Sequence, residues 1–349
     1  MTCTVPARLV ADQQVAKWKP TAPSGLPPLA PIDWPSIGLV GPTLLNTPES
    51  ITGVAADVVV IMWADSEWAP IHHIFCKSSA SMPYSSPAPE SYPGWIRDDA
   101  DGRKWGEYRL VQVGDRRVLL YKSNIHYAYQ GAAALTSLIR RLINLQTKTP
   151  LILSTGTAGG ANSHDHVGTV VIVNSAALWD QSKAPSEWPQ YSSTWHPSTS
   201  RLASIEALLV PIPVTNDGLT YLVQQFDEHT NSDDSLDELD PLQLNHADIK
   251  PQIHDLTGAG TALLTANEFL VGTTDNKLDS YACVEMDDAI IAAECQKESI
   301  LYGSVRNLSD PAQPPVLGRT GGAWGSCVYD VYGFYTSYNG ALAAWAAIG

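Results

Sequence analysis

Four polar or glycine-rich segments carry the side chains whose types and spacing could do chemistry. They are Asp65 to Glu67, Thr155 to Gly160, Val284 to Asp287, and Arg306 to Asp310. Carboxyl groups in such segments can donate a proton when neutral and accept one when ionised. They also accept hydrogen bonds from hydroxyl groups. In α/β folds ligands bind beyond the carboxyl ends of the strands, so segments that follow strands can meet in one place. We therefore expect these segments to form a binding or catalytic site.

The elements that must position these segments alternate between strands and helices. Apolar, β-branched runs predict the strands, and helical spacing of apolar residues predicts the helices. The strands are expected at residues 55–63, 108–113, 117–123, 150–154, 168–175, 262–271 and 300–305, with Gly114-Asp115 as the turn of a hairpin. The helices are expected at residues 131–146, 284–297 and 339–348, and a helix-like stretch at 219–226. This alternation predicts an α/β fold with a largely parallel central sheet.

Two regions differ in composition from the predicted domain, which spans residues 54–349. Residues 1–53 are rich in proline, which lacks a backbone donor and fixes φ, so an extended arm is expected there. Residues 178–255 are polar and are interpreted as insertions. Their acidic stretch, residues 227–240, does not match the spacing of a calcium loop and is expected to be a solvated surface segment.

The composition excludes several classes of function. The formal net charge is −15 and the sequence pI is about 4.9, so a nucleic acid is not expected as a partner. No apolar run reaches 18 residues, so no membrane span is expected. The first 30 residues lack the basic start and apolar block of a secretory signal, which favours a cytoplasmic protein.

Neither the cysteines nor the histidines predict a metal site or a disulfide framework. The five cysteines are odd in number and form no C-x-x-C pair. The sequence His164-Asp165-His166 is interpreted as a polar loop rather than a metal site. No metal and no cofactor are therefore expected.

Taken in order, several motifs resemble the nucleoside phosphorylase and nucleosidase superfamily, and within it most closely the methylthioadenosine/S-adenosylhomocysteine nucleosidases. The resemblance covers about residues 55–175 and 260–310. The matching segments are Leu153 to Gly160, Val167 to Ile172, Thr265 to Phe269, Val284 to Asp287, and Val305 to Asp310. The resemblance implies a three-layer α/β/α fold with a mixed, largely parallel central sheet, and a homo-oligomer, most simply a dimer.

The resemblance also implies a pair of catalytic acids. Asp310 would protonate the purine at N7, and Ser309 would orient its carboxyl group. Glu67 would activate the attacking water, with Asp65 as the alternative. Taken alone, Asp310 could equally cap the next turn, and Glu67 could be a surface glutamate at a helix start.

Further residues would contact the substrate. In the nucleosidases a Glu-Met-Glu motif holds the ribose hydroxyls, and here it reads Glu285, Met286 and Asp287. Because Asp287 is one methylene shorter, the ribose would lie deeper, be modified, or be held by Glu285 instead. The other residues implied are Phe269, which would stack on the base, Leu270, whose backbone would read the base edge, Ala158 and Gly159, which let the backbone approach the base, and Ile125.

Two segments depart from the family pattern. Where the nucleosidases have a Ser-Gly-Ile-Gly-Lys-like turn, this chain has Ser123 to Tyr127, with the bulkier Asn124, His126 and Tyr127. The aromatic, glycine-rich residues 321–338 could form an unusual pocket for a 5′ substituent.

The leading hypothesis is a purine nucleosidase that hydrolyses the N-glycosidic bond of an adenine-type or 5′-modified nucleoside. A phosphorylase is the first alternative, but its Gly-Asp-Pro-x-Arg loop is absent after the first strand. A non-catalytic nucleoside-binding or storage protein on the same fold is the second.

Overall fold

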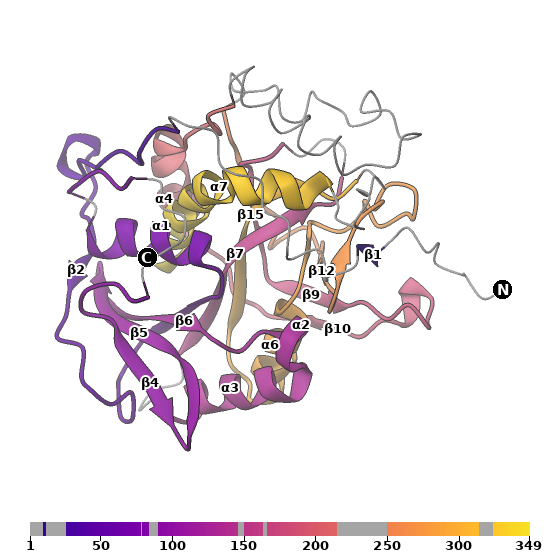
Figure 1. Cartoon of the computed structure of the whole chain (residues 1–349), viewed down its shortest axis with the longest axis horizontal. Coiled ribbons are helices and arrows are strands. Elements are labelled where there is room, and N and C mark those ends of the chain that lie inside the picture. The colour runs from indigo at the N-terminus through magenta and orange to yellow at the C-terminus, as the bar shows by residue number, and fades with distance from the viewer. Residues whose placement is uncertain are drawn as a thin grey trace.

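The computed structural model describes residues 10–11, 26–77, 79–83, 90–145, 150–162, 166–214, 250–313 and 324–349 (Figure 1). The strands are β1 (Val10–Ala11), β2 (Thr43–Leu44), β3 (Val58–Met62), β4 (Ile96–Ala100), β5 (Arg103–Val113), β6 (Arg116–Ser123), β7 (Leu151–Gly160), β8 (Val170–Val173), β9 (Ser175–Leu178), β10 (Gln190–Ser192), β11 (Ile253–Asp255), β12 (Leu263–Thr265), β13 (Phe269–Leu270), β14 (Val284–Glu285) and β15 (Tyr302–Pro311). The helices are α1 (Asp65–Cys76), α2 (Tyr127–Gln130), α3 (Ala132–Leu145), α4 (Thr199–Ile205), α6 (Asp288–Lys297) and α7 (Trp324–Ile348), with short 3₁₀ turns at Pro35–Ile37, Pro185–Glu187 and Glu206–Leu208.

A mixed sheet forms the centre of the molecule. Strand β3 pairs in parallel with β6 on one side and β7 on the other, and β7 pairs in parallel with β15. The antiparallel hairpin of β5 and β6, extended by β2 and β4, continues the sheet at one end. The central strand β3 is rich in β-branched residues, and all of its residues are buried. This composition is typical of a strand whose two faces are both covered. The α/β fold with a mixed sheet is therefore confirmed.

Helices cover both faces of this sheet, as alternate residues of β3 show. Val58 and Val60 pack in one apolar cluster together with residues of α1 and α7, including Trp345. Val59 and Ile61 point the other way, into a second cluster that contains residues of α3 and α6. In Figure 1, α7 and α1 lie on one side of β7 and β15, and α3 and α6 on the other. The arrangement is the three-layer one that was predicted.

Two of the segments that were expected to follow strands are themselves parts of strands. Strand β7 continues through residues 155–160, and β15 continues through residues 306–311. The two segments pair with each other in parallel, with Arg306 opposite Gly156 and, after a shift in register, Asp310 opposite Gly159. Because each strand supplies the other's backbone partners, neither segment ends where its apolar run ends. The expectation that these residues follow the strands was therefore wrong.

Other boundaries also differ from the prediction. The strand expected at 262–271 is split into β12 and β13, and Glu285 belongs to the short strand β14 rather than to the helix that follows. Helix α7 begins at Trp324, well before the predicted residue 339, and takes in most of residues 321–338. Its early turns are aromatic and buried between α1 and β15, so no amphipathic pattern marks them.

Several predictions lie wholly or partly outside the described residues. These are the helix-like stretch at 219–226, the acidic residues 227–240, His164 and Asp165, and most of residues 1–25. Of the described part of residues 1–53, Leu29, Ile32 and Trp34 are buried, and the ring of Trp34 lies 4.5 Å from that of Trp345. Within the described ranges, α7 and the other helices are too short or too polar to span a bilayer.

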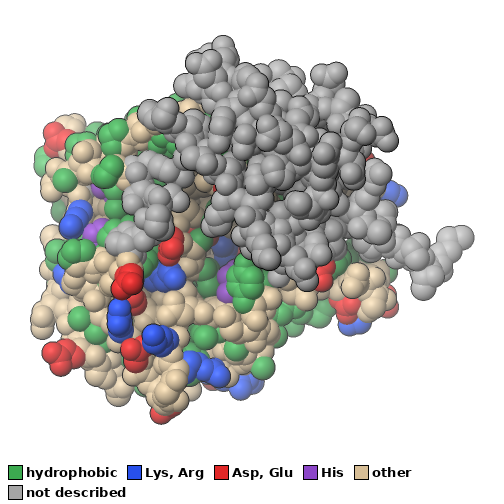
Figure 2. Space-filling view, viewed as in Figure 1, with side chains coloured by type: hydrophobic (Ala, Val, Ile, Leu, Met, Phe, Trp, Pro, Cys, Tyr) green, Lys and Arg blue, Asp and Glu red, His purple; other side chains and the backbone are tan. Residues whose placement is uncertain are grey.

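Charged side chains of both signs occur together on the surface. Figure 2 shows Lys and Arg interspersed with Asp and Glu over the part of this face that β4, β5 and β6 form.

Candidate active site

Asp310 lies near the end of β15 and is only 3 % exposed. The register between β15 and β7 shifts between Leu308 and Asp310, which places Asp310 opposite Gly159. The hydroxyl of Ser309 lies 2.5 Å from Oδ1 of Asp310 and 3.3 Å from the carbonyl oxygen of Ala158. Among the described residues, Oδ2 has no hydrogen-bond partner. A buried polar atom in this state is uncommon and is available to a ligand.

The surroundings of Asp310 favour its protonated form. Burial raises the pKa of Asp310 to about 7, and the hydrogen bond from Ser309 opposes this shift. Oδ1 already has a hydrogen-bond partner in Ser309, so Oδ2 is the oxygen that is left to interact with a ligand. A Cβ atom added at Gly159 or Gly325 would lie 3.2 or 2.8 Å from Oδ2. Glycine at these two positions keeps side-chain atoms away from that oxygen.

Glu67 lies in the first turn of α1, directly after β3, and is buried. Its Oε2 accepts the backbone N–H groups of Trp63 and Ala64, each at 2.9 Å. Its Oε1 accepts both the backbone N–H and the hydroxyl of Thr157 on β7, each at 2.8 Å. The carboxylate therefore closes the β3–α1 turn and ties it to β7.

Asp65, the alternative to Glu67, faces solvent. Its side chain is 61 % exposed, and the nearest charged partner is Lys122, whose Nζ lies 3.9 Å from Oδ1. Of the two carboxylates in this turn, only Glu67 points into the protein.

A buried arginine holds several oxygens of the site together. The Nε of Arg306 donates to Oδ2 of Asp288 at 2.8 Å. Its Nη2 lies 3.2 Å from Oε2 of Glu285 and donates to the hydroxyl of Ser154 at 2.7 Å. Arg306 therefore pairs with two buried carboxylates, those of Asp288 and Glu285. The two carboxylates neutralise a charge that could not be buried alone.

Glu285 anchors the start of α6. Its oxygens accept the hydroxyl of Thr265 and the backbone N–H groups of Asp287 and Asp288. Burial and the charge of Asp288 raise the pKa of Glu285 to about 7, although Arg306 opposes the shift. Because protein donors already surround both oxygens, Glu285 is poorly placed to hold the hydroxyls of a sugar.

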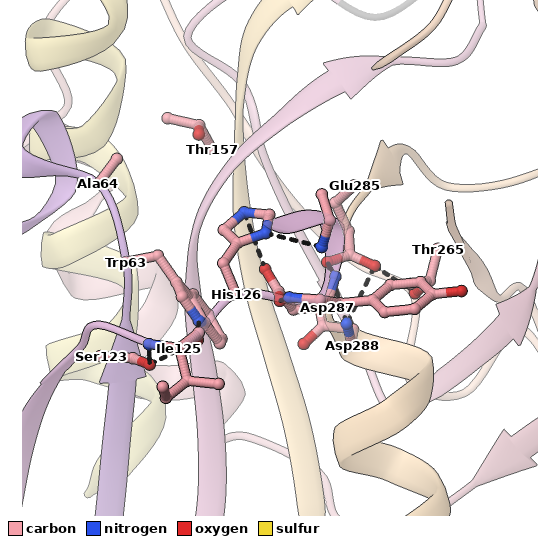
Figure 3. A network of polar contacts seen from close by, with 12 residues as sticks. Trp63, Ala64, Ser123, Ile125, His126, Thr157, Thr265, Glu285, Asp287 and Asp288 are labelled. Carbon is pink, nitrogen blue, oxygen red and sulfur yellow. Dashed lines mark hydrogen bonds and ion pairs between the residues drawn. The ribbon is translucent and has the colours of Figure 1, made fainter. Parts of the chain in front are cut away.

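Asp287 faces the turn that follows β6 (Figure 3). Its Oδ1 accepts the backbone N–H of Tyr127 at 2.8 Å, and its Oδ2 lies 3.3 Å from Nε2 of His126. Burial, and after it the charge of Glu285, raises the pKa of Asp287 well above its ordinary value. One backbone N–H donates to Asp287 and two donate to Glu285, so Asp287 has more free capacity to accept a hydrogen bond from a ligand.

The turn at residues 123–127 has a defined shape. The backbone N–H of Ile125 donates to the hydroxyl of Ser123, which in turn donates to the carbonyl of Ile125. The indole N–H of Trp63 donates to the same carbonyl at 2.8 Å. These contacts fix the backbone immediately before His126. Figure 3 shows the ring of His126 between Trp63 and the acidic residues.

The residues expected to contact the base occupy neighbouring strands. Phe269 and Leu270 form β13, where Phe269 is half-buried and Leu270 is buried. Ala158 and Gly159 are buried on β7, which β14 joins at Gly159. Met286 follows β14 and is half-buried. Their contact with a substrate stays a prediction.

The second half of β7 brings the catalytic candidates into one region. Thr157 donates to Glu67, and its carbonyl accepts Nη1 of Arg306 at 3.4 Å. Two residues further along, Gly159 pairs with Asp310. Glu67 and Asp310 are more than 200 residues apart in the sequence, and both lie beside β7.

Sequence reasoning missed the roles of Thr265, Asp288 and His126. Thr265 donates to Glu285 and also accepts the backbone N–H of Ala289, so it supports the start of α6 from β12. A useful signal was Arg306 within an apolar strand, because a buried arginine requires nearby acids. Which acids it would choose depended on the fold.

No family model and no curated protein matches the chain, whereas several solved structures are similar to it. The 5′-methylthioadenosine/S-adenosylhomocysteine nucleosidase of Neisseria meningitidis is 15 % identical, with a TM-score of 0.45 over 83 % of this chain and 97 % of that one. Futalosine hydrolase of Helicobacter pylori is 12 % identical, with a TM-score of 0.47 over 83 % and 97 %. S-adenosylhomocysteine nucleosidase of Streptococcus pyogenes is 13 % identical, with a TM-score of 0.47 over 83 % and 95 %. The solved structures to which this chain is similar thus include members of the superfamily whose motifs its sequence resembles.

Proposed function

We propose that the chain is a purine nucleosidase, which hydrolyses the N-glycosidic bond of a purine nucleoside to the free base and a ribose derivative. The observation that carries this proposal is Oδ2 of Asp310, a buried oxygen without a partner among the described residues. Near neutral pH this carboxyl group is protonated in a substantial fraction of molecules, because burial raises its pKa to about 7. The N7 atom of a purine can accept the proton that this carboxyl group would donate.

The reaction then needs few groups. Asp310 gives the proton on Oδ2 to N7, and the C1′–N9 bond breaks with its electron pair passing to the base. A water oxygen bonds to C1′, and one proton of this water is taken up by Glu67, which first releases one of the four protein hydrogen bonds that its two oxygens accept. The sugar cation that forms on the way resembles an oxocarbenium ion, so a base on the face opposite the leaving group is the expected partner. Asp287 would hold the sugar, and Phe269 would stack on the base.

Water is favoured over phosphate as the nucleophile. A phosphate needs unneutralised arginine or lysine side chains around it. Arg306, which lies among the candidate residues, already pairs with Asp288 and Glu285. Since its charge is compensated twice, it offers little attraction to an added anion.

A nucleoside panel tests the proposal directly. The purified protein is incubated with adenosine, methylthioadenosine, S-adenosylhomocysteine, inosine, guanosine and uridine, with and without phosphate, and free base is followed by chromatography. Release of a purine base at the same rate in both conditions is expected. Release that depends on phosphate would make the chain a phosphorylase, and release from none of the nucleosides would leave a protein that only binds them.

Glu67→Gln is expected to lower kcat by about 100-fold, because a neutral amide cannot take a proton from water. It is also expected to destabilise the fold by about 1–3 kcal/mol, because the amide nitrogen must face backbone N–H donors. Chemical denaturation and steady-state kinetics measure the two effects separately. Thr157→Val is the matched control, since it removes one hydrogen bond to Glu67 and keeps the carboxylate. A folded Glu67→Gln protein with wild-type kcat would show that Glu67 is only structural.

A further inference from the structure

The imidazole of His126 covers one oxygen of the carboxylate that is proposed to hold the sugar. His126 stands at the N-cap of α2, where its Nδ1 accepts the backbone N–H of Ala128 at 3.1 Å. Its other nitrogen, Nε2, lies 3.3 Å from Oδ2 of Asp287. In Figure 3 the ring points toward Asp287 from the side of Trp63. The contact joins two segments that are far apart in the sequence, so it is a product of the fold.

The tautomer of His126 follows from these contacts. A neutral imidazole has one N–H and one acceptor nitrogen. Because Nδ1 accepts the Ala128 N–H, the proton of the neutral ring is on Nε2 and faces Asp287. Burial lowers the pKa of His126 to about 4, which keeps the ring neutral at physiological pH. The N–H beside Asp287 is therefore present under working conditions.

The two oxygens of Asp287 differ in what lies against them. Oδ1 has only the backbone N–H of Tyr127, a small donor that leaves room for a second one. Oδ2 has a whole imidazole ring, and the side chain of Asp287 is only 4 % exposed. A carboxylate that binds two adjacent hydroxyls uses both oxygens. Each oxygen keeps a second lone pair, but the bulky imidazole ring occupies space beside Oδ2, whereas the backbone N–H occupies little beside Oδ1. We therefore expect Asp287 to accept one hydroxyl rather than two.

We propose that His126 is a specificity-determining residue, which restricts Asp287 to a single sugar hydroxyl and so selects purine nucleosides that lack one ribose hydroxyl, the deoxynucleosides. The inference rests on the proposed nucleosidase function. A ribonucleoside would bring a second hydroxyl against the imidazole, where it loses water and gains no carboxylate partner. An unmade hydrogen bond of this kind costs roughly tenfold to a hundredfold in specificity.

A conservative substitution separates this role from helix capping. Asparagine is among the preferred N-cap residues, and its side-chain oxygen can accept the Ala128 N–H. Its side chain is too short to cover Asp287. His126→Asn therefore keeps the turn and uncovers Oδ2. A second variant, Asp287→Glu, acts from the other side, because the extra methylene carries the carboxylate past the imidazole.

The test compares kcat/KM for adenosine, 2′-deoxyadenosine and 3′-deoxyadenosine. The wild-type protein is expected to prefer one deoxynucleoside over adenosine by at least about tenfold. His126→Asn and Asp287→Glu are each expected to reduce that preference by about tenfold, mainly through faster turnover of adenosine. Thermal unfolding of each variant confirms that it folds.

The outcomes distinguish this inference from the function on which it rests. A wild-type protein that prefers adenosine, or a preference unchanged in both folded variants, overturns the role of His126 and leaves the nucleosidase intact. Release of base from no nucleoside overturns the proposed function and the inference with it.

Discussion

Asp310→Asn is expected to lower the rate of base release by about 10²–10⁴-fold, with little change in KM. Asparagine keeps the acceptor for the Ser309 hydroxyl but has no carboxyl proton to give to N7. The measurement is kcat under saturating nucleoside, with circular dichroism to show that the variant is folded. Wild-type kcat in the folded variant would remove Asp310 from the chemistry.

The same carboxyl group sets the expected pH dependence of activity. Its pKa is raised to about 7, and the protonated form is the active one, so kcat/KM should fall as pH rises through about 7. Ser309→Ala is the matched control. The Ser309 hydrogen bond lowers the pKa of Asp310, so its loss should move this fall to higher pH while the acid remains in place. A fall in activity at the same pH in both proteins would assign the titration to another group.

Stability should show the matching dependence. The native state favours the protonated carboxyl, whereas the unfolded chain releases that proton near its ordinary pKa of 3.8. The wild-type protein therefore loses stability as pH rises from about 4 to about 7, by at most about 4 kcal/mol. Asp310→Asn has no such charge to bury, so urea denaturation should find it more stable relative to the wild type at pH 8 than at pH 4.

Arg306→Leu is expected to cost about 3–5 kcal/mol of folding free energy, the largest stability effect among the described side chains of the site. The substitution leaves Asp288 and Glu285 buried beside each other without their common cation. It also removes the donor to the hydroxyl of Ser154. Urea denaturation near neutral pH measures the loss.

Two control variants show how much of the lost folding free energy is due to the buried charge of Arg306. Arg116→Leu removes a half-exposed arginine whose partner Asp115 lies 3.8 Å away, and it should cost less than about 1 kcal/mol. Arg306→Lys keeps the charge but cannot bridge two acids with one planar group, so its cost should be intermediate. An Arg306→Leu protein that unfolds at the wild-type midpoint would show that the buried acids do not depend on this cation.

Local pattern alone predicted the elements whose burial is regular. The apolar run of β3, the hairpin of β5 and β6 around Gly114-Asp115, and the amphipathic stripe of α3 all lie close to their expected positions. These signals are reliable because one periodicity decides which face is buried. The acids at 67, 285, 287 and 310 could also be selected from the sequence, because each stands in a motif beside a predicted element.

Tertiary structure decided how far the strands run and what each acid contacts. The glycine-rich half of β7 has no apolar run, and it is strand only because β15 supplies its hydrogen-bond partners. The contacts of Glu285 and Asp287 differ because Arg306 and Thr265 contact Glu285, whereas His126 contacts Asp287. These three partners come from distant parts of the chain. Such contacts have no local signature, because backbone pairing and buried charge compensation arise only when the folded chain excludes water.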